Sequence, residues 1–464
     1  MRITSPAPSE DLLGAAPLPE EGYSTLDAGR SRCAPSAPAR WGRRRGSLSA
    51  PGVMVAAGPS APWRASRLCS RRLGGPWPIS VNLNIAPGTR IGYFVVMNDL
   101  PGAIWNRDWR VLRQLLPPGW EAEAKKRGAL RRARGVESAE ALLRVLLIHL
   151  AAGCSLVETA ARARSAGLAR LSSVALFKRL QAAEDWLRWL AVEERRLLSG
   201  PMPDGDRRIL AVDATTVSEP GSTGTDWRLH YGINLVNLQC EYFELTDVRG
   251  GESLRRLPVV RGDVVLGDGG YSQAPGIQHV LHAGADVVVR LNWHSLPLFS
   301  ETGVRIDPLA PRRQRVGEVY ERACWVHPGA GPPFAGRLIR VRRSAAATQR
   351  AQQRLRRRAK RKGHRLRPET LVAASYFLLW TSLPPATAAA DILELYRRRW
   401  QIELNFKRMK TILGLGHLPK KDPASARAWL HGKLLTSLLV ERTIQAANAF
   451  SPWGYALPAP LPLA

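Results

Sequence analysis

Two aspartates stand where a lone carboxylate is unexpected. Asp213 lies inside the apolar run Ile209–Val217, and Asp268 follows the apolar run Val264–Gly267 and precedes two glycines. A charged carboxylate is costly to bury without a partner, and open α/β sheets place their ligands at the carboxyl ends of strands. Taken singly, each residue has the alternative explanation of an ordinary turn or strand-end acid, and for Asp268 alone that explanation is equally good. Together they indicate carboxylates that converge on Mg²⁺, which prefers oxygen ligands.

A third carboxylate is expected from a helix over about residues 388–413. Four residues at helical spacing share one face with Lys407, namely Tyr396, Arg399, Glu403 and Lys410. A separate apolar stripe is formed by Leu395, Ile402, Phe406, Met409 and Leu413, so one face is predicted to pack while the other reaches a ligand. A surface stripe of helical ion pairs is the alternative.

Such carboxylates could cleave a phosphodiester bond. Two Mg²⁺ ions about 3.5 to 4 Å apart can activate a water or a 3′-hydroxyl and can stabilise the leaving oxygen. Basic groups beside Glu403 would then hold the phosphates of the substrate.

The elements that must position these residues follow a definite order. Strand-like runs are expected at 209–217, 227–235, 241–247, 264–267 and 287–291, with a helix at 275–283, a strand at 376–381 and the helix at 388–413. This is the order of an α/β fold with a ribonuclease-H-like mixed sheet and flanking helices. The analogy concerns the fold and does not establish the chemistry.

Composition divides the 464 residues into segments. Residues 1–96 are rich in Pro, Arg, Ser and Gly without periodicity, and are predicted to be disordered or a spurious extension upstream of Met97. A helical DNA-binding domain is expected over 97–200 and the catalytic domain over 201–293 and 371–445. A basic, β-rich insert over 294–370 interrupts that domain, and a Pro-rich tail covers 446–464.

Two segments are candidates for DNA contact. Ser155–Ala166, a turn at Gly167 and Ser172–Leu180 resemble a helix-turn-helix with Lys178 and Arg179 on its second helix, although plain helix packing explains them equally. The basic run Arg354–Arg367 is expected to bind DNA, with a solvated charged segment as the alternative.

Charge and cysteine content bound the location and the partners. A formal net charge of +30 favours a polyanionic partner such as nucleic acid, unless a GC-rich coding sequence has simply enriched arginine. The five cysteines lack the spacing of a zinc site. No apolar run is long enough to span a bilayer. The N-terminus also lacks the basic segment followed by an apolar run that is typical of a secretion signal. A cytoplasmic, DNA-associated protein without membrane contact is therefore expected.

The pattern Tyr396-x2-Arg399-x3-Glu403-x6-Lys410 resembles the Tyr-Arg-Glu-Lys signature of the insertion-sequence DDE transposases of family four, and Asp213 and Asp268 stand where that family has its aspartates. The resemblance covers about residues 105–442. It implies a ribonuclease-H-like catalytic domain in which the two aspartates and Glu403 bind Mg²⁺, with Mn²⁺ able to replace it.

The same resemblance implies how DNA is held. Tyr396, Arg399 and Lys410 would contact phosphates near the cleaved end, and Lys407 shares their face. Arg290 is a further candidate because Val287–Asn292 resembles the strand after the family's second aspartate.

The hypothesis drawn from these residues and this resemblance is a DDE transposase that cuts DNA at the ends of an insertion sequence and joins them to target DNA. Its partners would be double-stranded DNA, as terminal inverted repeats and target, and a second copy of the chain in a synaptic homodimer. A nuclease on the same fold and an inactive, basic DNA-binding remnant of a transposase are the alternatives.

Overall fold

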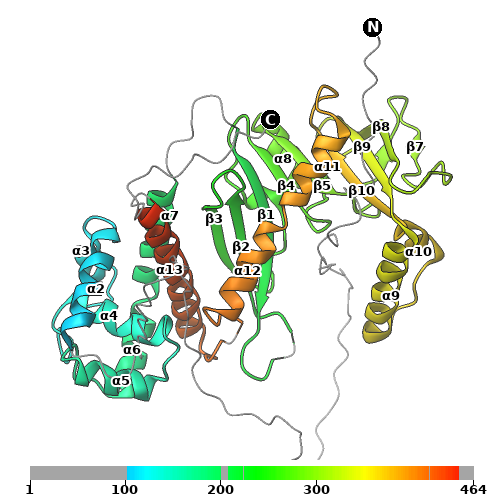
Figure 1. The fold of residues 1–464 in the computed structure, drawn as a ribbon. Coiled ribbons are helices and arrows are strands. Elements are labelled where there is room, and N and C mark those ends of the chain that lie inside the picture. The colour runs from blue at the N-terminus through cyan, green and yellow to red at the C-terminus, as the bar shows by residue number, and fades with distance from the viewer. Residues whose placement is uncertain (1–101, 200–206, 223, 417, 449–464) are drawn as a thin grey trace, which may run out of the picture. The chain divides into compact units, whose positions relative to one another are not determined.

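The computed structural model describes residues 102–199, 207–222, 224–416 and 418–448. The expectations for residues 1–96 and for most of the tail fall outside these ranges. The described elements divide into a helical part that precedes residue 200 and a long mixed sheet with helices on both faces (Figure 1).

Six helices make up the first part: α2 (Gly102–Leu115), α3 (Trp120–Lys126), α4 (Ala139–Leu150), α5 (Leu156–Ser165), α6 (Ser173–Ala182) and α7 (Glu184–Leu198). Ser138, Ser155 and Ser172 cap α4, α5 and α6, because each hydroxyl accepts a hydrogen bond from a backbone N–H in the first turn. The C-terminal helix α13 (Pro423–Asn448) packs along α7. α13 therefore shares a core with the helices that precede the sheet.

In the described ranges the sheet has ten strands, in the order β3-β2-β1-β4-β5-β10-β9-β8-β6-β7. The first five in the chain are β1 (Ile209–Val217), β2 (Trp227–Asn234), β3 (Cys240–Asp247), β4 (Val264–Gly267) and β5 (Asp286–Arg290). β1 pairs with β4 and β4 with β5 in parallel, whereas β2 and β3 are antiparallel. The predicted ribonuclease-H-like mixed sheet is confirmed, and the expected limits of β1 and β4 are confirmed to the residue.

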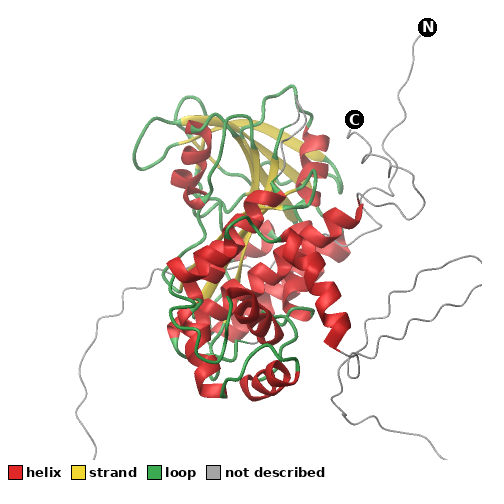
Figure 2. Cartoon of the chain, turned by 90° about the vertical axis from the view of Figure 1, so that its left-hand side faces the viewer, coloured by secondary structure: helices red, strands yellow, loops and turns green. Residues whose placement is uncertain are grey.

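Helices cover both faces of the sheet (Figure 2). On one face, Leu210 and Val265 pack with Ile277 of α8 (Ala274–His282), which follows the short 3-10 helix η1 (Leu254–Arg256). On the other, Leu266 packs with Ile392 of α11 (Ala389–Arg398), and α12 (Gln401–Thr411) packs against β1 and β2. Successive strand residues point to opposite faces, so every second residue of β1 and β4 faces α11 and α12.

The expected insert extends the sheet and does not form a sheet of its own. Its strands are β6 (Leu298–Phe299), β7 (Arg305–Ile306), β8 (Val319–Val326) and β9 (Phe334–Arg342), followed by α9 (Ala345–Lys362) and α10 (Pro368–Ala373). β9 pairs antiparallel with β10 (Tyr376–Thr381), and β10 pairs with β5. The insert is thus joined to the catalytic sheet by backbone hydrogen bonds.

The single helix expected over about 388–413 is wrong, because the chain forms α11 and α12 with a tightened turn between them. There the backbone N–H of Arg399 donates to Tyr396 O at 3.1 Å, and that of Ile402 donates to Arg399 O at 3.2 Å. These three-residue spacings are typical of a 3-10 turn. Trp400, which lies in this turn, is 38% exposed.

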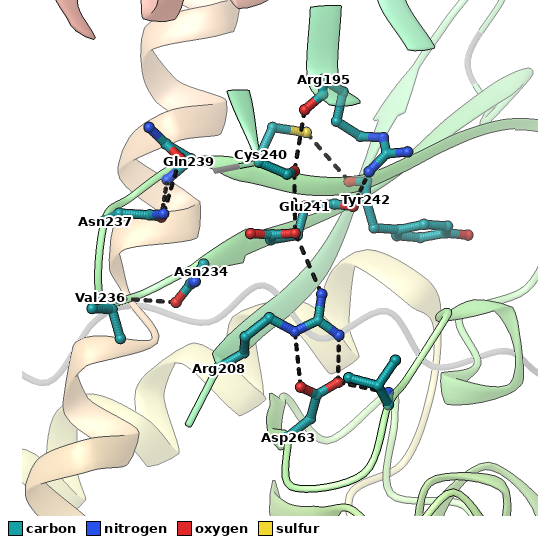
Figure 3. Close-up of polar contacts among 12 residues, drawn as sticks. Arg195, Arg208, Asn234, Val236, Asn237, Gln239, Cys240, Glu241, Tyr242 and Asp263 are labelled. Carbon is teal, nitrogen blue, oxygen red and sulfur yellow. Dashed lines mark hydrogen bonds and ion pairs between the residues drawn. The ribbon is translucent and has the colours of Figure 1, made fainter. Parts of the chain in front are cut away.

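An ion pair fastens the two strands that carry the aspartates (Figure 3). Arg208 precedes β1 and donates to both carboxylate oxygens of Asp263, which precedes β4, at 2.9 and 2.7 Å. Glu241 of β3 lies 3.5 Å from the same guanidinium, and Asp263 is buried. Two parallel hydrogen bonds give this pair a defined geometry, so it holds the starts of β1 and β4 in register.

Three of the five cysteines, Cys154, Cys240 and Cys324, are free and buried. Cys33 and Cys69 lie outside the described residues. Within the described ranges, no helix has both the length and the apolar character needed to cross a bilayer.

Candidate active site

Asp213 and Asp268 lie on neighbouring parallel strands at the same level. Ala211 of β1 is paired with Leu266 of β4, so two residues further on Asp213 stands across from Asp268. Alternation along the strands turns both toward the face that α11 and α12 cover. The Asp213 carboxylate accepts a hydrogen bond from the backbone N–H of Ala214 at 2.7 Å.

The two aspartates repel one another. Burial raises the pKa of Asp213 well above its ordinary value, and the negative charge of Asp268 raises it further, while Arg399 and the backbone N–H of Ala214 oppose the shift. The repulsion between two neighbouring carboxylates is relieved either by a shared proton or by a divalent cation. The arrangement therefore has the electrostatic character of a cation site.

Glu403 reaches the aspartates through Arg399. The Arg399 guanidinium is 1% exposed, with Nη2 2.7 Å from Glu403 Oε1 and Nη1 3.8 Å from Asp213 Oδ2. The predicted third carboxylate therefore belongs to the same cluster as Asp213. The expected contact of Arg399 with DNA phosphates stays a prediction, but in this structure its guanidinium pairs with carboxylates inside the protein.

The other residues of the predicted stripe differ in depth. Tyr396 is buried, and its hydroxyl donates to Gly267 O, directly before Asp268, at 3.2 Å. Lys410 is partly buried; burial lowers its pKa, and the charge of Asp213 opposes that shift, so the amine lies near the first aspartate. Lys407 is exposed.

Arg290 ends β5, next along the sheet from Asp268. Its guanidinium lies 5.8 Å from the ring centre of Phe377, which in turn contacts the ring of Tyr396 at 5.6 Å. The structure therefore brings Arg290 to the same side of the sheet as the signature residues.

A fourth carboxylate, Glu252, was missed by the sequence reasoning. It precedes η1, it is 7% exposed, and its charge contributes to the raised pKa of Asp213. A methyl group built on Gly270 would collide with Glu252 Oε2 and would lie 3.1 Å from Asp268 Oδ1, so the two carboxylates meet across this glycine. Glu252 sits in a glycine-rich turn without periodicity, and its sequence carries no signal for this placement.

The donor atoms suit a hard cation, but the described residues do not form a closed metal cage. In those ranges no three His, Cys, Asp or Glu side chains are grouped closely enough to hold a metal ion. Carboxylate oxygens are nevertheless the ligands that Mg²⁺ takes, and Arg399 lies between two of them. The residue types fit a divalent cation, and Glu403 is paired with the arginine.

The predicted helix pair is present as α5 and α6, with Gly167 at a positive φ of 67° between them. Lys178 is exposed on α6, whereas Arg179 donates to the backbone carbonyls of Arg132 and Arg134 at 2.5 and 3.1 Å. Arg179 therefore stabilises the loop before α4.

Comparison with known proteins identifies the family of the chain. The family described as "Transposase DDE domain" matches residues 204–439, which include all four carboxylates. The chain is 36% identical over 347 residues to the transposase for insertion sequence element IS421 of Escherichia coli, covering 72% of this chain and 93% of the relative. It is also 36% identical over 346 residues to InsL of insertion sequence element IS186A of Escherichia coli strain K12, with the same coverage.

The chain therefore belongs to the DDE transposase family, and the predicted transposase function is confirmed at that level. It is an enzyme of DNA transposition whose substrate is DNA.

Proposed function

We propose that Asp213, Asp268 and Glu403 bind Mg²⁺, or Mn²⁺ in its place, and that this chain uses the metal to cut and rejoin DNA at the ends of an insertion sequence. The observation that carries the proposal is the register of β1 and β4, which puts the two aspartates side by side within reach of the charge of Arg399. When bound, the divalent cation would activate the attacking oxygen and stabilise the leaving one.

Glu252 completes the negative side of the site. With it, four carboxylates face one buried guanidinium and one partly buried amine, so the cluster keeps an excess of negative charge to attract a cation. Glu252 contacts the same glycine as Asp268 and would orient that carboxylate. Glu403 would exchange its contact with Arg399 for the metal, and Arg399 would remain as its positioning residue.

The basic side chains would hold the DNA. Lys407 is exposed one turn after Glu403, and Lys410 and Arg290 flank the aspartates, so these three are placed to contact phosphates beside the cleaved bond. Tyr396 acts from the interior by holding the strand end before Asp268. Trp400, exposed at the turn before Glu403, offers a flat ring on which a base can stack.

The DNA substrate would be the terminal inverted repeats and the target, held by two copies of the chain. The relatives are transposases of insertion sequences by name, which supports ends of such an element as the site of cleavage. Residues 97–200, with α5 and α6, would bind the repeats. The enzyme would act in the cytoplasm on chromosomal DNA.

The test is cleavage of duplex DNA carrying the element's own ends in the presence of Mg²⁺. The full chain should cleave, and Glu403→Gln should abolish cleavage while DNA binding is kept. Glu394→Gln, which removes an α11 carboxylate whose side chain is 43% exposed, is the matched control and should cleave normally. Equal cleavage by both variants would remove Glu403 from the site, and no cleavage by the unaltered chain would favour an inactive DNA-binding remnant.

A further inference from the structure

The inserted helix α9 carries an unusual concentration of positive charge. Its 18 residues include eight basic side chains and no acidic one. Like charges four residues apart on a helix destabilise it by a few tenths of a kcal/mol per pair, or about 0.2 to 0.5. Such a helix is best stabilised by a polyanion outside the protein.

One face of α9 packs and the opposite face is a row of arginines. Ala351, Leu355 and Ala359 follow one another at four-residue spacing and are partly or fully buried, and Gln352 donates to Leu371 O at 3.0 Å on that side. The exposed arginines at spacings of four and three residues on the other face form what we call the arginine stripe: Arg350, Arg354, Arg357 and Arg361. At about 1.5 Å per residue, the stripe is about 16 Å long.

The arginine stripe has the chemistry of phosphate recognition. In the part of the chain that the structure describes, Arg350, Arg357 and Arg361 have no carboxylate partner. A guanidinium binds phosphate oxygens through two parallel hydrogen bonds. The stripe contains no exposed aromatic or large apolar side chain, so it offers charge and not a surface for docking another protein.

Strand register connects α9 to the catalytic edge of the sheet. β9 ends at Arg342, which pairs with Tyr376 at the start of β10, and β10 runs antiparallel to β5 so that Leu379 pairs with Arg290. The end of β9 therefore lies on the same edge as the ends of β5 and β4, where Asp268 stands. α9 begins three residues later, and three strand spacings between β4 and β9 amount to about 14 Å.

Two further cations lie along that edge. Arg290, at the end of β5, and Arg343, directly after β9, each place a guanidinium 5.8 Å from the ring centre of Phe377. The order along the edge is thus Asp268, Arg290, Arg343 and then α9. Arginines therefore stand at the ends of β5 and β9, between Asp268 and α9.

We propose that the arginine stripe of α9 binds the sugar–phosphate backbone of the duplex DNA whose cleaved end lies at the carboxylates. The inference rests on the proposed function only for which DNA is bound, because the charge and position of α9 are independent of the chemistry. Contacts to phosphates fix the position of a duplex without reading its sequence. α9 would therefore steady the DNA beyond the cut.

The experiment measures binding of the full chain to end-bearing duplex DNA, without divalent cation, over a range of salt concentrations. The test variant combines Arg350→Gln, Arg354→Gln, Arg357→Gln and Arg361→Gln. A control of equal net charge removes four scattered exposed arginines outside residues 97–200 and outside the stripe: Arg249, Arg261, Arg305 and Arg322. A second control replaces the stripe by four lysines, which keeps the charge and the helix.

Each phosphate contact contributes about 0.9 to the slope of log affinity against log salt, so the stripe variant should lose about 3 to 4 from that slope. The scattered control and the lysine variant should each show a slope within about 1 of that of the unaltered chain. A stripe variant that binds like the scattered control would overturn the inference. So would a loss that differs between DNA sequences of equal length, because that would mean base reading.

Shortening the duplex tests whether the DNA at α9 is the DNA at the carboxylates. The strand spacings amount to about 14 Å, and α9 continues beyond them before the stripe begins, so at about 3.4 Å per base pair the DNA needs at least about four base pairs beyond the cut to reach the stripe. The duplex is shortened from one end and then, separately, from the other. On the side that reaches α9, the difference in DNA affinity between the stripe variant and its scattered control should vanish once the duplex no longer extends that far. A difference that persists at every length would contradict the placement. Binding is measured without metal, so failure of Glu403→Gln to affect cleavage would leave this result unchanged.

Discussion

Replacing Arg399 should destabilise the protein, because the side chain is the buried cation between two carboxylates. Removing one partner of a fully buried pair costs about 3 to 5 kcal/mol. The side chains of Asp213 and Glu403 keep 18% and 22% of their exposure, so water screens part of the loss. We expect Arg399→Gln to lower the free energy of unfolding by about 2 to 3 kcal/mol.

Denaturant unfolding of the full chain measures this loss. Arg397→Gln is the matched control two residues away: the side chains of Arg397 and its partner Glu394 are 44% and 43% exposed, and the loss should stay below about 0.5 kcal/mol. Mg²⁺ should restore more stability to Arg399→Gln than it adds to the unaltered chain, because the cation replaces the missing charge. A loss for Arg399→Gln no larger than that of the control would refute the reasoning.

Three further outcomes are expected. Arg208→Met leaves the buried Asp263 without its guanidinium and should cost about 3 kcal/mol of unfolding free energy, whereas Arg207→Met, at an exposed position, should cost less than about 1; equal losses would contradict the role of the pair. Burial raises the pKa of Glu194 to about 7, so the native state keeps a proton that the unfolded state releases near 4.5, and stability falls as pH rises from 5 to 8. Glu194→Gln should reduce this decrease in the free energy of unfolding by up to about 3 kcal/mol, as measured by denaturant unfolding at pH 5 and pH 8. An unchanged decrease would argue against a buried neutral acid. Glu252→Gln should weaken Mn²⁺ binding by about 10-fold or more in a titration while DNA affinity stays the same, and unchanged Mn²⁺ affinity would place Glu252 outside the site.

The strands and their aspartates could be predicted because their signals are local. Apolar runs mark β1 and β4, and an acid inside or directly after such a run is conspicuous in the sequence. The spacing around Glu403 likewise placed Arg399 beside it, and the two side chains are paired although the expected helix is divided into α11 and α12. These features depend on neighbours in the chain.

The remaining features depend on distant parts of the chain. Helical spacing tells which residues share a direction but not how deep they lie, so the burial of Arg399 was not foreseen. Pairing of β9 with β10 joins the insert to the sheet through residues more than 30 positions apart. Glu252 enters the site only because its turn packs against the glycine after Asp268.

The central claim is that carboxylates from β1, the end of β4 and α12 form one metal site. Mn²⁺ binding to the full chain, followed by electron paramagnetic resonance, tests it most directly. The account predicts that Asp213→Asn, Asp268→Asn and Glu403→Gln each weaken binding of the same ion, while Glu394→Gln leaves it unchanged. Undiminished Mn²⁺ binding in any of the first three would contradict a shared site.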